Sequence, residues 1–144
     1  SQDLAKRVAK WATGVSFSIA MLPERIDERL DTMKPALEKE GRDIDELDVV
    51  ISTYLRLGSS REQAIKSFSE TYIGQRLFKR ANFNLDSFTS KSLFGTPDEV
   101  SEKIQNLGQQ GMKHCVLTNV GVDTFDEMLE QVQMFGEEVL PKFK

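Results

Sequence analysis

The stretch "SLFGTPDEVSEKIQNLGQQGMKHCVLTNVG", residues 92–121, contains a helix start, a helix stop and a strand. Thr96 is the expected N-cap, Pro97 fits the first helical position, and the Glu99 carboxylate can reach back to the Thr96 amide. Gly111 can adopt the left-handed conformation that ends a helix, and "KHCVLTNV" then has the character of a strand. The stretch therefore predicts a helix followed by a strand, the alternation from which α/β folds are built.

A similar unit opens the chain. Apolar residues at helical spacing predict a helix over residues 1–12, and the alternation in "VSFSIAM" predicts a strand over residues 15–21. A second helical stripe runs from Pro23 to Gly41. Pro35 lies inside this stripe and should kink or shorten the helix, because proline removes one backbone donor.

A second unit begins with residues 48–58, whose nearly continuous apolar and β-branched character predicts a strand buried on both faces. Ser60 and Gln63 have the spacing of a capping box at the start of a helix that continues to Leu77. Residues 82–94 have no clear period and are predicted to form a long loop.

The last helix has the clearest apolar stripe in the chain, and Pro141 should end it. Thr124 and Glu127 are placed as another capping box at its start. Its apolar residues recur at three and four: Phe125, Met128, Leu129, Val132, Phe135 and Val139.

Strands that alternate with helices predict an α/β fold with a parallel sheet and right-handed crossovers. Three strands are predicted, whereas a closed (β/α)₈ barrel takes roughly 250 residues. We therefore expect residues 1–144 to form a single domain that is a partial barrel of about three parallel βα units. The edges of such a sheet need partners, which implies a missing half or a second copy of the chain. The chain also opens in helical spacing without an initiator Met, so we expect it to be part of a longer protein.

The composition narrows the class of protein. The 144 residues carry a net charge of -4 and no basic stripe, which argues against nucleic acid as a partner. No apolar run approaches the roughly 18 residues that suggest a membrane span. Cys115 is the single cysteine and cannot form an internal disulfide, which suits the reducing cytoplasm.

Ligand sites in barrels and open α/β sheets lie beyond the carboxyl ends of the strands. Arg56 near the end of the second strand, and Thr118 and Asn119 at the end of the third, are the candidates for substrate or rim contacts. Arg56 could hold a phosphate or carboxylate. The alternatives are an Arg56 paired with a neighbouring acid, and a Thr118–Asn119 pair that only ends its strand.

Other patterns carry little chemistry. His114 and Cys115 are adjacent, but neighbouring residues on a strand point to opposite faces, so structural roles are favoured over a thiol and base pair. The spacing of a metal site is absent, and so is a glycine-rich phosphate loop. Ser1 and Gln2 remain as a phosphate-site candidate, because a helix N-terminus presents free amides; simple capping is the alternative.

Taken together, these motifs resemble the bacterial luciferase-like monooxygenases, a family of flavin- or deazaflavin-dependent oxidoreductases. The residues that carry the resemblance are "SLFGTPDEVSEKIQNLGQQGMKHCVL", "DTFDEMLEQVQMFGEEVLPKFK", "AKRVAKWATG" and "EKEGRDIDELDVV", which cover essentially the whole chain. Thr13 stands where the family often has Asp.

The resemblance implies a (β/α)₈ barrel of which this chain is roughly the C-terminal half. It implies FMN or a deazaflavin coenzyme bound at the carboxyl-end mouth, a small organic substrate, and monooxygenation or hydride transfer by the cofactor ring. Ser1 and Gln2 align with the end of the family's phosphate-binding turn, whose glycines would precede residue 1. Most residues that hold the ring belong to the N-terminal half, so the catalytic residues stay unknown and this chain is expected to be inactive by itself.

Two other functions stay open. The first is a non-catalytic half-barrel module whose copies pair through their sheet edges. The second, by fold analogy alone, is a fragment of an aldolase- or isomerase-type barrel that binds phosphate. The absence of Lys or Glu at the predicted strand ends argues against the second.

Overall fold

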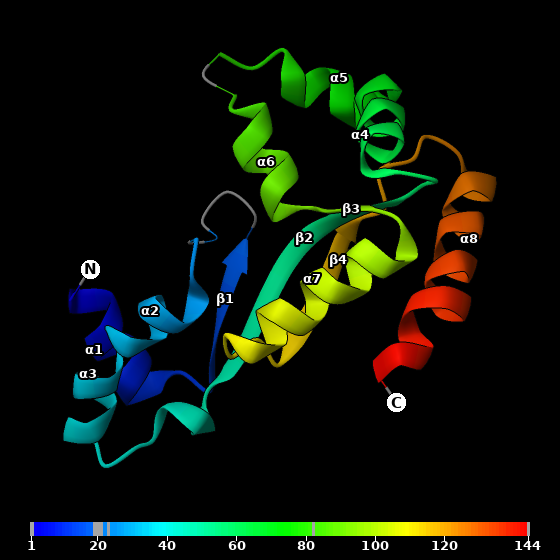
Figure 1. The fold of residues 1–144 in the computed structure, drawn as a ribbon. Coiled ribbons are helices and arrows are strands. Elements are labelled where there is room, and N and C mark those ends of the chain that lie inside the picture. Colours follow the sequence, from blue (N-terminus) through cyan, green and yellow to red (C-terminus); the bar gives the residue numbers. More distant parts are fainter. Residues whose placement is uncertain (1, 19–21, 23, 82, 144) are drawn as a thin grey trace. The chain divides into compact units, whose positions relative to one another are not determined.

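The computed structural model describes residues 2–18, 22, 24–81 and 83–143, with the side chains of Gln2 and Asn119 excepted. The chain forms two compact units. The first comprises Ser1–Ser52 and Asn106–Val116, and the second Thr53–Gln105 and Leu117–Lys144. β2, α7 and β4 contribute residues to both units (Figure 1).

The first unit begins with the predicted helix and strand, and residues 19–21 of the predicted strand lie outside the described residues. Its elements are α1 (Gln2–Trp11), β1 (Gly14–Ser18), α2 (Ile26–Asp31), α3 (Lys34–Lys39), a 3-10 turn (Ile44–Glu46) and the first part of β2 (Asp48–Leu57). The predicted helix between Pro23 and Gly41 is interrupted before Pro35, which occupies the first turn of α3. Gly41 follows with φ of 69°, a conformation that ends the helix and favours glycine.

β1 and β2 run in parallel, in a register that pairs Gly14 with Asp48 and Ser18 with Ser52. The chain entering β4 joins this part of the sheet, because Lys113 N donates to Val49 O at 2.9 Å. Two apolar clusters cover it. One comprises Phe17, Leu22, Ile26, Leu30, Val49, Ile51 and Leu107, and the other Ala5, Val8, Ala9, Met33, Leu37 and Leu47.

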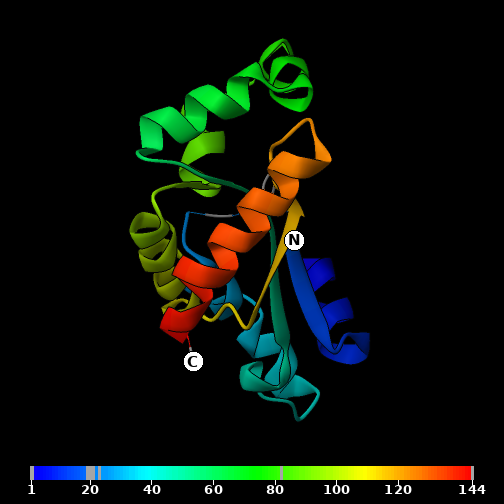
Figure 2. The ribbon, with the colours of Figure 1, turned by 90° about the vertical axis from the view of Figure 1, so that its right-hand side faces the viewer.

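The second unit contains most of the remaining elements. They are α4 (Arg61–Glu70), α5 (Tyr72–Phe78), α6 (Leu85–Lys91), β3 (Leu93–Gly95), α7 (Pro97–Gln109), β4 (His114–Asn119), α8 (Phe125–Met134), a π-helical turn (Phe135–Val139) and a 3-10 turn (Leu140–Phe143). β3 pairs in parallel with the end of β2, Leu55 with Leu93 and Leu57 with Gly95. β4 also pairs with β2. Figure 2 shows α8 running from the loop after β4 toward the C-terminal end.

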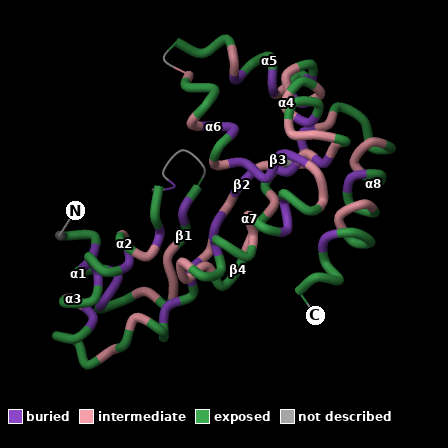
Figure 3. The backbone as a smooth tube through the Cα atoms, viewed as in Figure 1, coloured by how far each residue is buried: buried purple, intermediate pink, exposed green. Residues whose placement is uncertain are grey.

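Three features of this unit correct the sequence prediction. In place of the loop predicted over residues 82–94, Leu85–Lys91 form α6 and Leu93–Gly95 form β3, so the described sheet has four strands, where three were predicted. The helix predicted from Ser60 to Leu77 is two helices, because Thr71 has the extended backbone of an N-cap and its hydroxyl accepts from Gly74 N. β2 alternates between buried and half-buried residues, so it is not continuously buried on both faces (Figure 3).

A cluster of aromatic rings explains why α6 forms without an apolar period. Phe88 stacks on Phe68 with 5.6 Å between ring centroids and also contacts Tyr54 and Phe94. Asn84 caps the helix by accepting from Ser87 N at 2.8 Å. The buried ring of Phe88 and the Asn84 cap therefore help to hold this helix of seven residues. None of the helices in the described ranges is long and apolar enough to cross a membrane.

Candidate functional site

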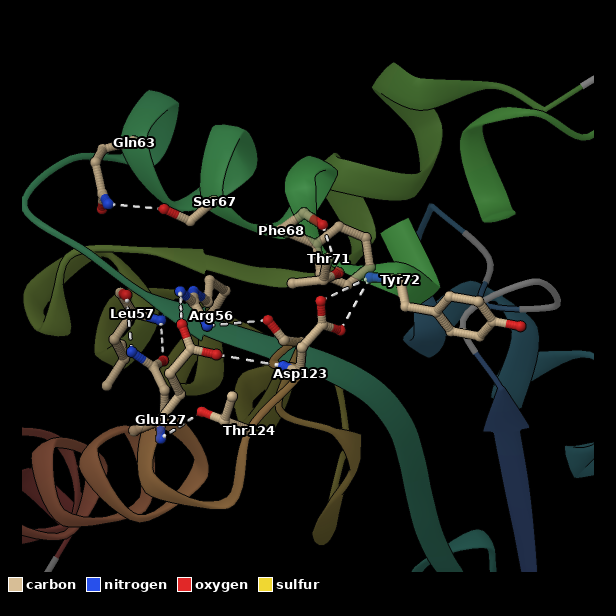
Figure 4. A network of polar contacts seen from close by, with 12 residues as sticks. Arg56, Leu57, Gln63, Ser67, Phe68, Thr71, Tyr72, Asp123, Thr124 and Glu127 are labelled. Atoms are coloured by element: carbon tan, nitrogen blue, oxygen red, sulfur yellow. Dashed lines mark hydrogen bonds and ion pairs between the residues drawn. The ribbon is translucent and has the colours of Figure 1, made fainter. Parts of the chain in front are cut away.

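The candidate site lies in the second unit, where β2 and β4 end (Figure 4). Arg56 is the charged residue that the sequence places there, and its side chain is only 12% exposed. One Nη donates to Gly121 O at 3.0 Å, and the other lies 3.8 Å from the Glu127 carboxylate. Arg56 therefore pairs with a neighbouring acid and fastens the loop that follows β4, although a guanidinium has more N–H donors than these contacts use.

The Glu127 carboxylate belongs to this network instead of capping the backbone of Thr124, as the sequence predicted. Thr124 Oγ1 accepts from Glu127 N at 3.2 Å, which confirms Thr124 as the N-cap of α8. The Glu127 carboxylate accepts from Asp123 N at 3.3 Å and faces Arg56, so the second half of the capping box is not seen. In contrast, Thr96 and Glu99 at the start of α7 form both halves of the predicted box.

The loop between β4 and α8 is also fixed to α5. Both carboxylate oxygens of Asp123 accept from Tyr72 N, at 2.9 and 3.0 Å. Gly121 has φ of 65°, and a Cβ built there would lie 2.6 Å from Cδ2 of Phe68. Only glycine combines this backbone conformation with so close an approach to a ring.

Gln131 makes a contact that the sequence did not reveal. It is 7% exposed on α8, its Oε1 accepts from Leu57 N at 2.7 Å, and its Nε2 donates to Leu57 O at 3.1 Å. The side-chain amide therefore satisfies both backbone groups of the last residue of β2, as a neighbouring strand would. No local signal reveals this contact, because the apolar stripe of the helix predicts that Gln131 lies on the exposed face.

Of the other residues predicted to contact a ligand, Thr118 is the one whose side chain the structure describes. Thr118 Oγ1 donates to Thr53 O at 2.9 Å, so its hydroxyl joins β4 to β2. The side chain of Asn119 lies outside the described residues, as do Ser1 and the side chain of Gln2. α1 begins at Gln2, in agreement with the expected helix start.

His114 and Cys115 do not form a thiol and base pair. The exposed His114 ring places Nε2 3.4 Å from Asp48 Oδ1. Burial raises the pKa of the Cys115 thiol to about 11, which keeps it protonated and unreactive. No group of three or more His, Cys, Asp or Glu residues in the described part of the chain could hold a metal ion.

Lys103 is a further titratable group whose pKa burial shifts. Its ammonium donates to the carbonyls of Ser90 and Ser92 at the end of α6. Burial, assisted by the charge of Arg61, lowers the pKa of Lys103 to about 8. Because its donors are used on these carbonyls, Lys103 serves to hold α6 against α7.

The described rim residues therefore hold the strand ends, the β4–α8 loop and the start of α5 together. Arg56 is the described rim side chain best suited to an anionic group, and the Glu127 carboxylate offsets part of its charge. A nucleophile with an adjacent base is absent from the described residues of this network. The residues present supply at most a small part of a flavin site.

The chain is similar in fold to several solved structures of oxidoreductases. No protein-family profile and no curated protein matches the chain. Among solved structures, the monooxygenase RslO1 from Streptomyces bottropensis is 25% identical with a TM-score of 0.65, covering 97% of this chain and 45% of that one. The coenzyme F420-dependent tetrahydromethanopterin reductase from Methanopyrus kandleri is 18% identical with a TM-score of 0.65, covering 100% and 49%.

A third similar structure contains FMN. It is the oxygenating constituent of 3,6-diketocamphane monooxygenase from Pseudomonas putida, 15% identical with a TM-score of 0.67, covering 96% of this chain and 45% of that one. The chain thus spans less than half the length of these three proteins. Coenzyme F420, on which the second of these proteins depends, and FMN, which the third contains, are the cofactors that the sequence resemblance implied. The resemblance to the luciferase-like monooxygenases is confirmed, and the fold of this chain is a partial (β/α)₈ barrel.

Proposed function

We propose that residues 1–144 form one domain, the C-terminal half of a luciferase-like oxidoreductase or monooxygenase that uses FMN or a deazaflavin coenzyme and a small organic substrate. The observation that carries this proposal is the share of each similar protein that the chain covers. The fold of nearly the whole chain matches less than half of a monooxygenase and of an F420-dependent reductase. When bound, the cofactor would supply the redox chemistry in such a protein.

Within the intact protein, we assign the cofactor phosphate to Ser1 and Gln2 at the start of α1, and substrate or rim contacts to Arg56, Thr118 and Asn119. Arg56 and Thr118 each donate a hydrogen bond to a backbone carbonyl, which favours a role for both in holding the shape of the rim. This half is therefore proposed to be inactive by itself. The single, unreactive Cys115 is consistent with a cytoplasmic location.

The exposed apolar face of α8 is evidence that another protein surface packs against this helix. Phe125, Leu129 and Val132 are 66, 50 and 54% exposed, although they form the apolar stripe of this helix. Neighbouring apolar side chains exposed to this extent are usual where another protein surface packs. We propose that the N-terminal half of the barrel covers this stripe.

Titration of FMN and of the deazaflavin coenzyme into the purified chain, followed by cofactor fluorescence, tests this proposal. The chain alone should bind neither tightly and should show no turnover with a reduced cofactor. The same chain produced together with the N-terminal half of the RslO1 monooxygenase should gain FMN or deazaflavin binding. Tight binding with turnover by the chain alone would show that the half is self-sufficient. Absence of any binding in the combined protein would count against the cofactor assignment.

The second candidate is a non-catalytic half-barrel module that self-associates through its sheet edges. The exposed stripe on α8 and the 46% exposure of Val116 on β4 favour it. Sedimentation velocity distinguishes the two candidate functions. A homo-oligomer that forms without flavin and does not bind it supports the module. A folded monomer counts against it.

A further inference from the structure

A cavity in the first unit is lined by residues of α1, α2 and α3, the helices labelled in Figure 1, and of the turns that follow α2 and α3. Its volume is about 700 Å³, within the range of about 300–1,000 Å³ that small-molecule sites occupy. All the residues that line it belong to the same compact unit: Ala5, Lys6, Arg29, Thr32, Pro35, Ala36, Lys39 and Glu40.

The sequence explains why this space is open. α2 and α3 are separate helices, and the α1 and α3 walls carry the short side chains of Ala5 and Ala36. The neighbouring α1–α3 contact is held by a buried apolar cluster that includes Val8 and Leu37. Arg42 fixes the end of α1 by donating to the carbonyls of the residues at positions 9 and 12, at 2.9 Å each. The walls are thus anchored, and the cavity is not closed by collapse of the helices.

The charges around the cavity are unbalanced. Lys6, Arg29 and Lys39 contribute three cations from three different helices, and among the described lining residues Glu40 is the single acid. Within the described part of the chain, no hydrogen bond or ion pair joins these three cationic groups to an acid. In contrast, Lys34 of α3 lies 2.7 Å from Asp31.

We propose that this cavity binds a small amphiphilic anion, a carboxylate or phosphate monoester attached to an apolar body. The three cations would hold the anionic head, and the wall formed by Ala5, Pro35 and Ala36 would contact the apolar body. Glu40 opposes the anion. This site is independent of the flavin proposal, because it uses none of the rim residues.

Isothermal titration calorimetry on residues 1–144 tests the site with decanoate and decyl phosphate, each kept below its aggregation concentration. Decyltrimethylammonium carries the same tail with the opposite charge, and inorganic phosphate carries charge without a tail. Both decyl anions should bind saturably with a stoichiometry of one, and the tighter of the two identifies the head group. The other two probes should bind at least about tenfold more weakly, since each lacks one of the two recognised features.

Variants locate the binding. R29Q and K39Q should each weaken it about fivefold, the loss expected from one partly solvated charge contact. R7Q, which removes an exposed arginine of α1 outside the cavity, is the matched control and should change nothing. E40Q should tighten binding because it removes the opposing charge. A36F should abolish it by filling the space, with circular dichroism confirming that the variant is folded.

Three results would overturn the proposal. The first is an absence of saturable binding by either decyl anion. The second is equal binding of decyltrimethylammonium, which would mean that the tail alone is recognised. The third is an equal loss in R7Q and R29Q, which would mean that the anion responds to the net charge of the protein rather than to this cavity.

Discussion

Replacement of Gln131 by methionine removes both side-chain hydrogen bonds to Leu57 while nearly preserving the volume of the side chain. The amide nitrogen and carbonyl oxygen of Leu57 then lose these partners in a site where Gln131 is only 7% exposed. An unsatisfied buried polar group costs about 1–3 kcal/mol, so the free energy of unfolding should fall by roughly 2–4 kcal/mol in Q131M.

Urea denaturation followed by far-ultraviolet circular dichroism measures this difference. Gln133 lies on the same helix, is exposed, and bonds only to the Glu137 side chain at 2.8 Å. Q133M is therefore the matched control and should change the free energy of unfolding by less than about 0.5 kcal/mol. If Q131M and Q133M lose the same amount, Gln131 does not complete the end of β2, and the reasoning fails.

Q131E adds a test of direction. A protonated glutamic acid accepts from Leu57 N and donates to Leu57 O, as the native amide does, whereas the carboxylate only accepts. Burial and the facing carbonyl should raise the folded-state pKa of this carboxyl above the unfolded value of about 4.3. The stability due to this group is then fully present below about pH 4.3 and is lost as pH rises through the folded pKa. The deficit of Q131E relative to wild type should therefore be smaller at pH 4 than at pH 7, and a constant deficit would contradict the bonding pattern.

Two further predictions concern the second unit. G121A should lose about 2–4 kcal/mol of stability from its positive φ and the contact with Phe68, whereas G41A, with φ of 69° but open space, should lose only about 1 kcal/mol; equal losses would refute the packing argument. Because the folded pKa of Lys103 is lowered to about 8, its contribution is present above the unfolded value near 10.5 and lost as pH falls through the folded pKa. The difference in stability between wild type and K103M should therefore rise by roughly 0.5–1 kcal/mol between pH 7.5 and 9, and denaturation of both proteins at each pH measures it. The comparison with K103M is needed because Cys115, whose folded pKa is raised to about 11, opposes the rise in both proteins once its unfolded thiol titrates near pH 8.5.

Local signals in the sequence predicted the elements whose causes are local. Thr96 and Glu99 satisfy each other at one helix start, and Pro35 interrupts a helix by its own missing donor. Such contacts involve residues a few positions apart, so spacing reveals them. The helix α6 was missed because Phe88 is held by rings that are distant in sequence, and β3 because Leu93–Gly95 is too short to show a period.

The sequence predicted where the rim lies, at the ends of the strands, but not the hydrogen bonds that its residues form. The sequence identified Arg56 and Thr118, since residues at strand ends follow from the order of the elements. It could not show that their donors would be used by Gly121 O and Thr53 O, because both bonds link residues 65 positions apart. Gln131 was missed for the same reason: its partner, Leu57, is 74 positions away.

α8 shows how these long-range contacts reverse the expected orientation of a helix. Glu127 and Gln131 are four residues apart, so they lie on one face, and this polar face contacts Arg56 and Leu57. Phe125, Leu129 and Val132, spaced by four and three, lie on the opposite face and are exposed. An apolar stripe alone predicts the reverse arrangement, with the stripe against the core. Because both strand-end contacts would be lost if α8 rotated to bury its stripe, the helix is held with that stripe outward, available for the second half of the proposed barrel.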